Sequence, residues 1–387
     1  MLILATLLLC ACADPPPPVQ VVVSAPAAPV EDVGTETSFG MRGEGPQNGG
    51  PRYPGLADLT LNGHGSAQAG YGTPTGVDPI PEWFVDLPAP APAAPPPDAE
   101  PGAFVVDTSG DVYAAYTYDG LIAVHPAAGA PHMLVKARKL PRDEEIFDLA
   151  LDATDVWFTS VSRSSDGSHA AYALRRVPKS GGTATVVTRG ALGDGGLVTR
   201  VFVDEAHVWF LRASKPFVYD LVQVPKAGGA EQTIAHDLAG FSPVAFDGER
   251  FYVYTGGSVG WVPKGGGPFT PIAATDDEVR SIVASQTDVY YTVRDKDGVR
   301  LYRAPKSGKA HMIGTYVAVQ PDLFFDRGAL YRNEATKGIP SPHRIVAELA
   351  TGGLTAAEGV PSGEYWRVQD GVAYWQDGAR FVRTPVR

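Results

Sequence analysis

A short phrase of residues returns seven times along this chain, at intervals of 38 to 52 residues. Each copy has a turn with Asp or Gly, a β-rich run that carries an aromatic residue, and a second β-rich run. The aromatic residues are Tyr113, Trp157, Trp209, Tyr252, Tyr290, Tyr331 and Tyr374. Repeats of this length that contain only strands are typical of β-propellers, in which each repeat forms one four-stranded blade. The sequence therefore predicts an all-β, seven-bladed β-propeller of four-stranded antiparallel blades over residues 101–387.

The second repeat, residues 145–190, shows the expected strands most clearly. Its innermost strand is Ile146–Leu151, followed by Asp155–Ser160, Ala173–Pro178 and Thr183–Thr188. Each strand is a short run of β-branched or aromatic residues bounded by turn residues. The other blades are predicted at 102–137, 198–237, 243–275, 281–316, 321–358 and 364–387.

The seventh repeat is shorter than the others and holds three strands, Tyr365–Gln369, Val372–Gln376 and Arg380–Pro385. A propeller closes its ring best when one blade combines strands from both ends of the chain, because an open edge invites pairing with other chains. We therefore expect the isolated strand-like segment Glu82–Leu87 to supply the missing outer strand of this blade.

Three repeats carry the sequence Val-Pro-Lys-x-Gly-Gly, at Val177–Gly182, Val224–Gly229 and Val262–Gly267, and a variant stands at Ala304–Gly308. It is expected in the hairpin before the outer strand, where proline presets the turn and glycine takes the positive φ. We interpret its lysines as edge residues that prevent strand-to-strand aggregation, with a binding ring as the alternative. Four aspartates lie five residues before an aromatic and are interpreted as structural turn residues: Asp152, Asp204, Asp247 and Asp326.

Composition separates the first 100 residues from the rest. They hold 18 of the 35 prolines and 11 acidic residues against 2 basic ones, so most of the net charge of −11 lies there. Segments rich in Pro, Gly and Ala bury too little apolar surface to fold, and proline-rich ones form extended spacers. Residues 13–100 are therefore predicted to be a disordered linker, either a stalk that holds a domain off a membrane or a passive connection. The nearly neutral remainder gives no electrostatic footprint for nucleic acid, and no nucleic-acid partner is expected.

Residues 1–12 predict export and lipidation. The apolar run Leu2–Leu9 is too short to span a bilayer and is typical of the core of a signal peptide. Leu9-Cys10-Ala11-Cys12 resembles the bacterial lipobox, and the resemblance implies that Cys12 receives lipid and becomes the mature N-terminus. An ordinary cleaved signal peptide is the alternative. Because Ala13 rather than an aspartate follows Cys12, the same resemblance favours the outer membrane in a Gram-negative host.

The phrases Asp-x-x-x-Val-Tyr/Trp-Phe-Thr and Val-Pro-Lys-x-Gly-Gly resemble those of secreted propeller lipoproteins of the myxobacterial type, a group that is mostly uncharacterised. More distantly, the repeats are similar to the Tyr-Trp-Thr-Asp, NHL and TolB-type propellers. The resemblance covers residues 102–387. It implies a binding role, because those families mainly bind other proteins or envelope components. No catalytic motif of these families transfers to a residue of this chain.

No residue is assigned to catalysis, to a cofactor or to a metal. The eight histidines are scattered without His-x-x-x-His or His-x-His spacing, which argues against a local zinc site. Gly256–Gly260 matches the Gly-x-Ser-x-Gly pattern of serine hydrolases, but it falls in a predicted hairpin, whereas a nucleophile elbow joins a strand to a helix. A site assembled from distant blades at the central channel stays open. A cluster of His, Asp and Glu there would indicate an enzyme.

Recognition is expected on one face of the propeller. The loops between second and third strands and those between successive blades lie on the same face, and loops on a rigid scaffold commonly carry function. Their charged residues are the candidate binding residues: Arg138, Arg142, Glu145, Arg163, Arg212, Lys215, Asp277, Arg294, Lys337 and His343. We therefore predict a cell-envelope lipoprotein, held to a membrane by its lipid, whose propeller binds a protein or an envelope component. The alternative is a propeller enzyme, a lyase or hydrolase acting on sugars or lactones at the central channel.

Overall fold

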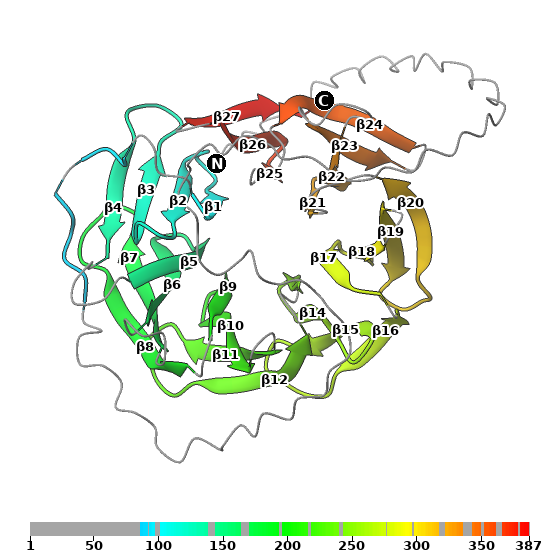
Figure 1. The fold of residues 1–387 in the computed structure, drawn as a ribbon, viewed down its shortest axis with the longest axis horizontal. Coiled ribbons are helices and arrows are strands. Elements are labelled where there is room, and N and C mark those ends of the chain that lie inside the picture. Colours follow the sequence, from blue (N-terminus) through cyan, green and yellow to red (C-terminus); the bar gives the residue numbers. More distant parts are fainter. Residues whose placement is uncertain are drawn as a thin grey trace, which may run out of the picture. The chain divides into compact units, whose positions relative to one another are not determined.

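The computed structural model describes residues 86–386 except for short gaps at 92, 97–100, 138–143, 164–169, 193–195, 216–217, 240–242, 276, 296–297, 317–321, 336–342, 350–351, 361–365 and 378–379. All described residues belong to one compact unit, residues 72–387. Within them, 27 strands form seven antiparallel sheets, which are arranged as the blades of a ring (Figure 1). In the described part of the chain, no helix has the length and apolar character needed to cross a membrane.

The strands follow one another around the ring in chain order. Blades 1 and 2 are β1 (Ala103–Val106), β2 (Val112–Tyr116), β3 (Leu121–His125), β4 (His132–Lys136), β5 (Glu144–Leu151), β6 (Asp155–Arg163), β7 (Ala170–Pro178) and β8 (Thr185–Leu192). Blades 3 and 4 are β9 (Val198–Val203), β10 (His207–Lys215), β11 (Val218–Pro225), β12 (Gln232–Ala239), β13 (Ala245–Phe246), β14 (Arg250–Thr255), β15 (Ser258–Pro263) and β16 (Thr270–Ala274). Blades 5 and 6 are β17 (Val279–Ala284), β18 (Asp288–Asp295), β19 (Gly298–Pro305), β20 (His311–Tyr316), β21 (Leu323–Asp326), β22 (Ala329–Ala335), β23 (His343–Leu349) and β24 (Gly352–Val360). Blade 7 is β25 (Trp366–Gln369), β26 (Val372–Asp377) and β27 (Arg380–Pro385).

This arrangement confirms the predicted seven-bladed propeller. Six blades have four strands, and the described part of blade 7 has three. Every repeat aromatic lies in the second strand of its blade, from Tyr113 in β2 to Tyr374 in β26. The first strand of each blade lies nearest the centre of the ring and the last strand lies at the rim (Figure 1).

Each blade buries both of its faces against its neighbours, so the middle strands are continuous apolar runs. All five residues of β2 are buried, and Trp157 and Trp209 are 0% exposed. Hydrophobic clusters fill every junction between successive blades, from the one that joins Val156 and Leu134 to the one that joins Trp366 and Tyr331. Full burial of one such large side chain contributes about 2–3 kcal/mol of transfer free energy.

Apolar packing also joins the last blade to the first. Phe104, Val106 and Tyr116 of blade 1 form one cluster with Tyr374 and partly buried Phe381 of blade 7. Two polar contacts cross the same junction. The side-chain amide of Gln369 donates to the carbonyl of Val106 at 3.0 Å, and Arg383 donates to the carbonyl of His125 at 2.8 Å. Among the described residues, the ring therefore closes without a strand exchanged between the two blades.

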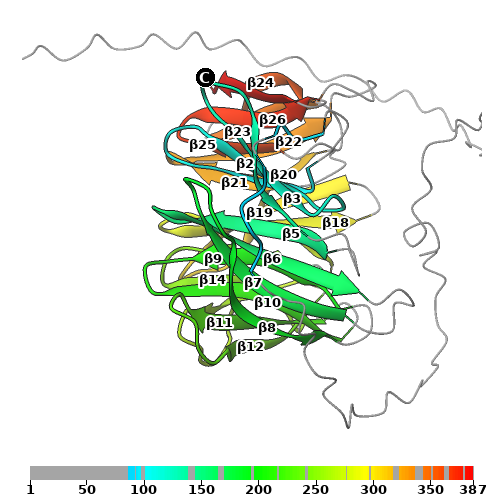
Figure 2. The same cartoon turned by 90° about the vertical axis from the view of Figure 1, so that its left-hand side faces the viewer.

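The segment expected to complete blade 7 lies elsewhere. Glu82–Val85 is outside the described residues, but Leu87 exchanges two 2.8 Å backbone hydrogen bonds with Ala184, just before β8 of blade 2. The carbonyl of Ala93 then accepts from Met133 of β4 at 2.9 Å. The described residues 86–91 and 93–96 thus run along the outer side of blades 1 and 2, where they appear as the blue segment in Figures 1 and 2. For Leu87 the expectation is corrected, because its side chain, 1% exposed, is buried in the apolar junction of those two blades.

Three of the four predicted turn aspartates hold the turn between the first and second strands of their blade, whereas Asp326 accepts from the Asp370 and Gly371 amides of blade 7. Asp152 accepts from the backbone N–H groups of Thr154 and Asp155 at 2.9 and 2.8 Å, and Asp247 does the same with Glu249 and Arg250 at 3.0 and 2.9 Å. Asp107 and Asp204 form equivalent turns. Such Asx turns are the structural role that the sequence indicated.

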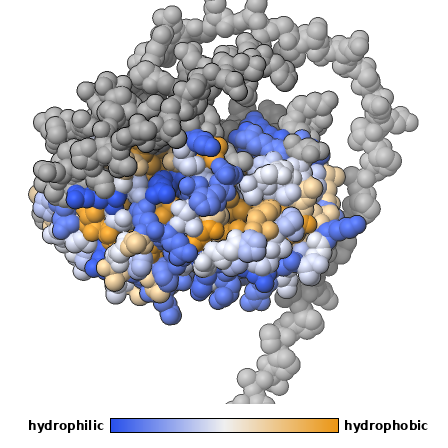
Figure 3. All heavy atoms as spheres, turned by 90° about the horizontal axis from the view of Figure 1, so that it is seen from below, coloured by the Kyte–Doolittle hydropathy of each residue, from blue (hydrophilic) through white to orange (hydrophobic). Residues whose placement is uncertain are grey.

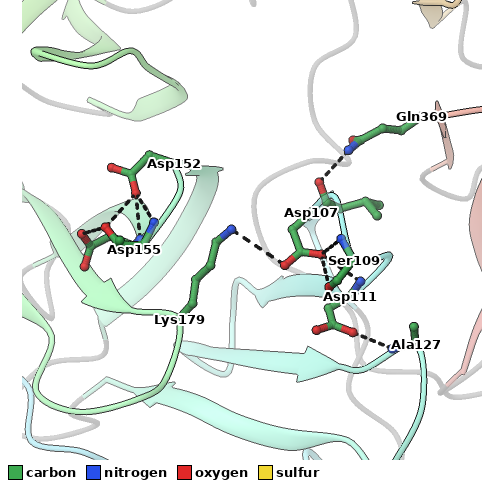
Figure 4. Close-up of polar contacts among 10 residues, drawn as sticks. Asp107, Ser109, Asp111, Ala127, Asp152, Asp155, Lys179 and Gln369 are labelled. Atoms are coloured by element: carbon green, nitrogen blue, oxygen red, sulfur yellow. Dashed lines mark hydrogen bonds and ion pairs between the residues drawn. The ribbon is translucent and has the colours of Figure 1, made fainter. Parts of the chain in front are cut away.

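The lysines of the Val-Pro-Lys-x-Gly-Gly element pair with these aspartates across blades. Lys179 of blade 2 lies 3.8 Å from Asp107 of blade 1, a contact drawn in Figure 4. The pattern repeats as Lys226–Asp152, Lys264–Asp204 and Lys306–Asp247. Three of these ammonium groups also lie 5.1–5.8 Å from the ring centre of the repeat aromatic of the preceding blade. The lysines therefore join successive blades, which corrects their interpretation as free edge residues. We call each Asp–Lys pair with its aromatic a latch.

The best-formed latch predicts a pH dependence of stability. Burial acts to raise the pKa of Asp247, but hydrogen bonds from Lys306, from the Tyr252 hydroxyl and from two backbone amides outweigh it and lower the pKa from 3.8 to about 2. Because the folded-state pKa is depressed, the stabilisation is present above about pH 4 and is lost as the pH falls towards 2. For a fully buried group a shift of this size corresponds to about 2 kcal/mol, and because Asp247 is partly exposed, screening by solvent reduces its contribution to about 1 kcal/mol.

Asp247→Asn should therefore lower the free energy of unfolding by about 1 kcal/mol at neutral pH, and the difference from the unsubstituted protein should shrink between about pH 4 and 2. Urea unfolding across this pH range measures it. Glu249→Gln is the control, because that side chain is 82% exposed and lies in the same turn. Equal stability of the Asp247→Asn and unsubstituted proteins at neutral pH would show that the latch contributes nothing.

Candidate functional site

The first strands of the blades line a central cavity of about 520 Å³. One residue of each first strand is paired with the repeat aromatic of the neighbouring second strand, which places these seven residues at one level. The seven residues are Val105, Ala150, Phe202, Ala245, Val283, Phe324 and Arg367, and all line the cavity. Six of them are apolar, so a single guanidinium, that of Arg367, interrupts an otherwise apolar ring.

A second level of the cavity is polar. Residues two positions earlier in several blades also line the cavity. They include Asp148 of β5, Arg200 of β9 and Ser281 of β17, together with Asp322 directly before β21. The cavity thus combines one polar level with one apolar level.

The polar level lies towards the face predicted for recognition. Glu144, at the beginning of β5, pairs with Ser162 near the end of β6, and Val198 of β9 pairs with Arg212 of β10. The beginnings of the first strands therefore lie beside the hairpins between second and third strands and beside the loops between blades. We call this the loop-rich face. The latches lie at the opposite ends of the first strands.

Arg200 has an unusual backbone. Its φ is 52°, in the left-handed region that costs a residue with a side chain roughly 1 kcal/mol or more. Phe210 pairs with Val201 and Leu211 with Thr199, so Arg200 is the extra residue of a β-bulge. Bulges re-aim side chains and are common beside functional sites. This one bends the strand at the polar level of the cavity.

The charges of the cavity influence one another. Burial raises the pKa of Asp148, although Arg200 and the Val201 amide, which donates to Asp148 at 3.0 Å, act against it. Burial also raises the pKa of Asp322, against the effect of Arg200. Burial lowers the pKa of Arg367, against the effect of Asp148. Carboxylates and guanidiniums therefore share a partly enclosed site, in which Arg200 is exposed and each charge influences the others.

This arrangement suits binding of a charged small molecule. Two carboxylates can accept hydrogen bonds, and two guanidiniums can each present a planar set of donors. The described lining residues include neither histidine nor glutamate. No group of three His, Cys, Asp or Glu side chains placed to hold a metal is found among the described residues. Ser258 of the Gly-x-Ser-x-Gly sequence lies in a β14–β15 hairpin, so its neighbourhood has no nucleophile elbow.

Six of the predicted loop residues have described side chains. Arg212 donates to Glu231 at 2.7 Å and to the Tyr172 hydroxyl at 3.1 Å, which ties blades 2 and 3 together. Asp277 pairs with Arg300 at 2.5 Å, and Glu145 pairs with Arg163 at 3.9 Å. Lys215 and Arg294 are exposed.

The other predicted site residues are not tested. Arg138, Arg142, Lys337 and the lipidation candidate Cys12 lie outside the described residues, and only the backbone of His343 is described. The charged residues of the cavity, in contrast, were not singled out from the sequence. An alignment of the repeats could have revealed these residues. Asp148, Arg200, Asp322 and Arg367 occupy repeat positions where other blades have small or apolar residues.

Comparisons with known proteins identify the fold. No family model matches the sequence, and no curated protein matches it. A virginiamycin B lyase from Staphylococcus aureus, solved as an inactive variant with quinupristin, is 12% identical with a TM-score of 0.55 and covers 77% of this chain and 98% of its own. A streptogramin B lyase is 13% identical with a TM-score of 0.53, over 79% of this chain and 99% of its own. The nidogen/laminin complex gives 14% identity, a TM-score of 0.41 and coverage of 55% and 86%. The two lyases share the propeller fold with this chain, and at such low identity the likeness extends to the fold alone.

The backbone of Arg200 generates a prediction. Glycine takes a positive φ without cost, whereas alanine does not, so Arg200→Gly should be more stable than Arg200→Ala by about 1 kcal/mol. Urea unfolding of the two variants measures the difference. At Arg176, a strand position with ordinary φ, the order should reverse, because glycine in a strand interior costs about 0.5–1 kcal/mol. The same order at both positions would mean that Arg200 is not strained.

Proposed function

We propose that this protein is a lipid-anchored module of the bacterial cell envelope whose propeller binds a protein or an envelope component through its loop-rich face. The observation that carries the proposal is the charged cavity at the centre of the ring, whose polar level lies towards that face. Concave sites with a few converging polar groups on a rigid scaffold are the usual form of a binding site.

The described residues on the outer rim of the ring, which Figure 3 shows edge-on, present a mixed surface. On the side seen in Figure 3, hydrophilic and hydrophobic residues are interspersed. Tyr118 and Met312 are the large hydrophobic residues that stand exposed in the described part of the chain. Polar contacts and the shape of the cavity would therefore determine what the propeller selects.

A propeller enzyme is the second candidate. Carboxylates with a raised pKa in a cavity are candidates for proton transfer, and Asp148 and Asp322 are of this kind. Two proteins of similar fold are named as lyases. The described lining lacks the combination of His, Asp and Glu that would indicate catalysis, so we place binding first.

Site-specific photo-crosslinking in cells tests the binding face. A photoreactive residue at Lys215 or Arg294, which are exposed on the loop-rich face, should capture one reproducible partner. The same residue at Glu249, which is exposed at the opposite ends of the first strands, should not capture it. Capture of the same molecules from both faces, or of none from the loop-rich face, would contradict the proposal.

The lipid anchor has its own test. Cys12→Ser should move the protein from the membrane fraction to the soluble fraction, because the lipidated thiol is then missing. Cys10→Ser is the matched control and should leave the protein with the membrane. Metabolic labelling with a fatty-acid analogue should mark only the protein that keeps Cys12. Label that persists after Cys12→Ser would contradict the anchor.

A further inference from the structure

Arg367 is the least satisfied charge of the cavity. It occupies the one position of the apolar level where the other blades have Val, Ala or Phe. Its guanidinium lies 5.9 Å from the ring centre of Phe324. It forms no hydrogen bond or ion pair with a described residue. The attraction of Asp148 and the contact with the Phe324 ring offset only part of the hydration that this partly buried guanidinium loses, so an anion that accepts its hydrogen bonds would be favoured there.

Arg200 supplies a second open guanidinium at the polar level. It comes from blade 3, whereas Arg367 comes from blade 7. The strained backbone of Arg200 is kept at a bulge that faces the cavity, and no described carboxylate forms an ion pair with this side chain. The remaining arginine of the lining, Arg280, is already paired with Glu278 at 2.6 Å. Two guanidiniums are thus available to one anionic group.

Asp322 adds a hydrogen-bond acceptor with negative charge to the site. This carboxylate accepts no hydrogen bond from a described residue, whereas Asp148 accepts one from Val201. Because two carboxylates balance two guanidiniums, the site has no excess positive charge to favour a ligand with several negative charges, such as a phosphate ester. A ligand with one negative group and one group that donates hydrogen bonds would instead satisfy both kinds of side chain.

We propose that the central cavity binds a small zwitterionic ligand with a free α-carboxylate, of the kind found in amino acids and short peptides. The carboxylate binds Arg367 and Arg200, and the ammonium group binds Asp322. The inference rests on the proposed function and names the ligand class for it. The cavity volume of about 520 Å³ is in the range of small-molecule sites, which is sufficient for a short peptide.

Calorimetric titration of the purified full chain in detergent tests the ligand class. The probes are a set of dipeptides, each in its free form, with an amidated C-terminus, and with an acetylated N-terminus. The free form should bind saturably, and amidation should weaken binding at least tenfold because the charged group recognised by arginine is lost. Equal binding of the free and amidated forms, or no saturable binding of any probe, would overturn the inference.

Variants locate the site. Arg367→Gln should weaken binding of the free dipeptide roughly tenfold or more, whereas Arg380→Gln, at an exposed arginine of β27, should leave it unchanged. Asp322→Asn should weaken the free form more than the acetylated form, because only the free form carries the ammonium group. If Arg367→Gln fails to fold, Arg367→Lys keeps the charge but not the planar pair of donors and should bind with intermediate affinity. Unchanged affinity in a folded Arg367→Gln protein would exclude this site.

The two proposals fail in different ways. Face-specific crosslinking of a partner without binding of any dipeptide would leave the binding module standing and remove the zwitterion site. Dipeptide binding that depends on Arg367, without a crosslinked partner, would support a small-molecule site and contradict a macromolecular partner.

Discussion

The fold depends on the apolar packing between blades. A single blade cannot cover its own hydrophobic faces, and each blade buries its two faces only when it has a neighbour on each side. The aromatic residue of every second strand lies in this packing, and the junction of blade 7 with blade 1 uses the same kind of contact as the others. Closure is therefore a property of seven similar interfaces. It does not require a special strand in the described part of the chain.

The latches add specific polar contacts between successive blades to this packing. Each aspartate belongs to one blade and its lysine to the next, so the ion pair, the Asx turn and the aromatic ring are linked across the junction. Because these pairs lie at one end of the first strands, they hold that end of the cavity. The charged level lies towards the other end of the cavity, where Arg200 forms the bulge of β9.

The architecture could be predicted from the sequence because each blade is formed by one continuous repeat of the chain. The aromatic positions predicted all seven second strands, and the strands expected for blade 2 agree with β5–β8 within a few residues. The position of the segment around Leu87 could not be predicted. A single apolar residue in a proline-rich segment shows no repeating pattern, so the sequence does not indicate which blade it contacts. The latches were also missed, since Asp107 and Lys179 are far apart in the sequence and each looks like an ordinary turn or edge residue. The charged cavity was missed for a related reason: its members stand one per blade, and only the closed ring brings them together.

The chemistry of the junctions is not uniform around the ring. Four junctions, from blades 1 and 2 to blades 4 and 5, have the same Asp and Lys pair. In blade 5, Ser285 takes the place of the aspartate and forms the turn by accepting from Asp288, and in blade 6, Asp326 accepts from Asp370 and Gly371 of blade 7. Blades 1 to 5 therefore carry interchangeable connectors, and one of them could be duplicated or lost during evolution while its neighbours still matched. Blades 5 to 7 carry different connectors, so duplication or loss of a blade there would leave a mismatched junction.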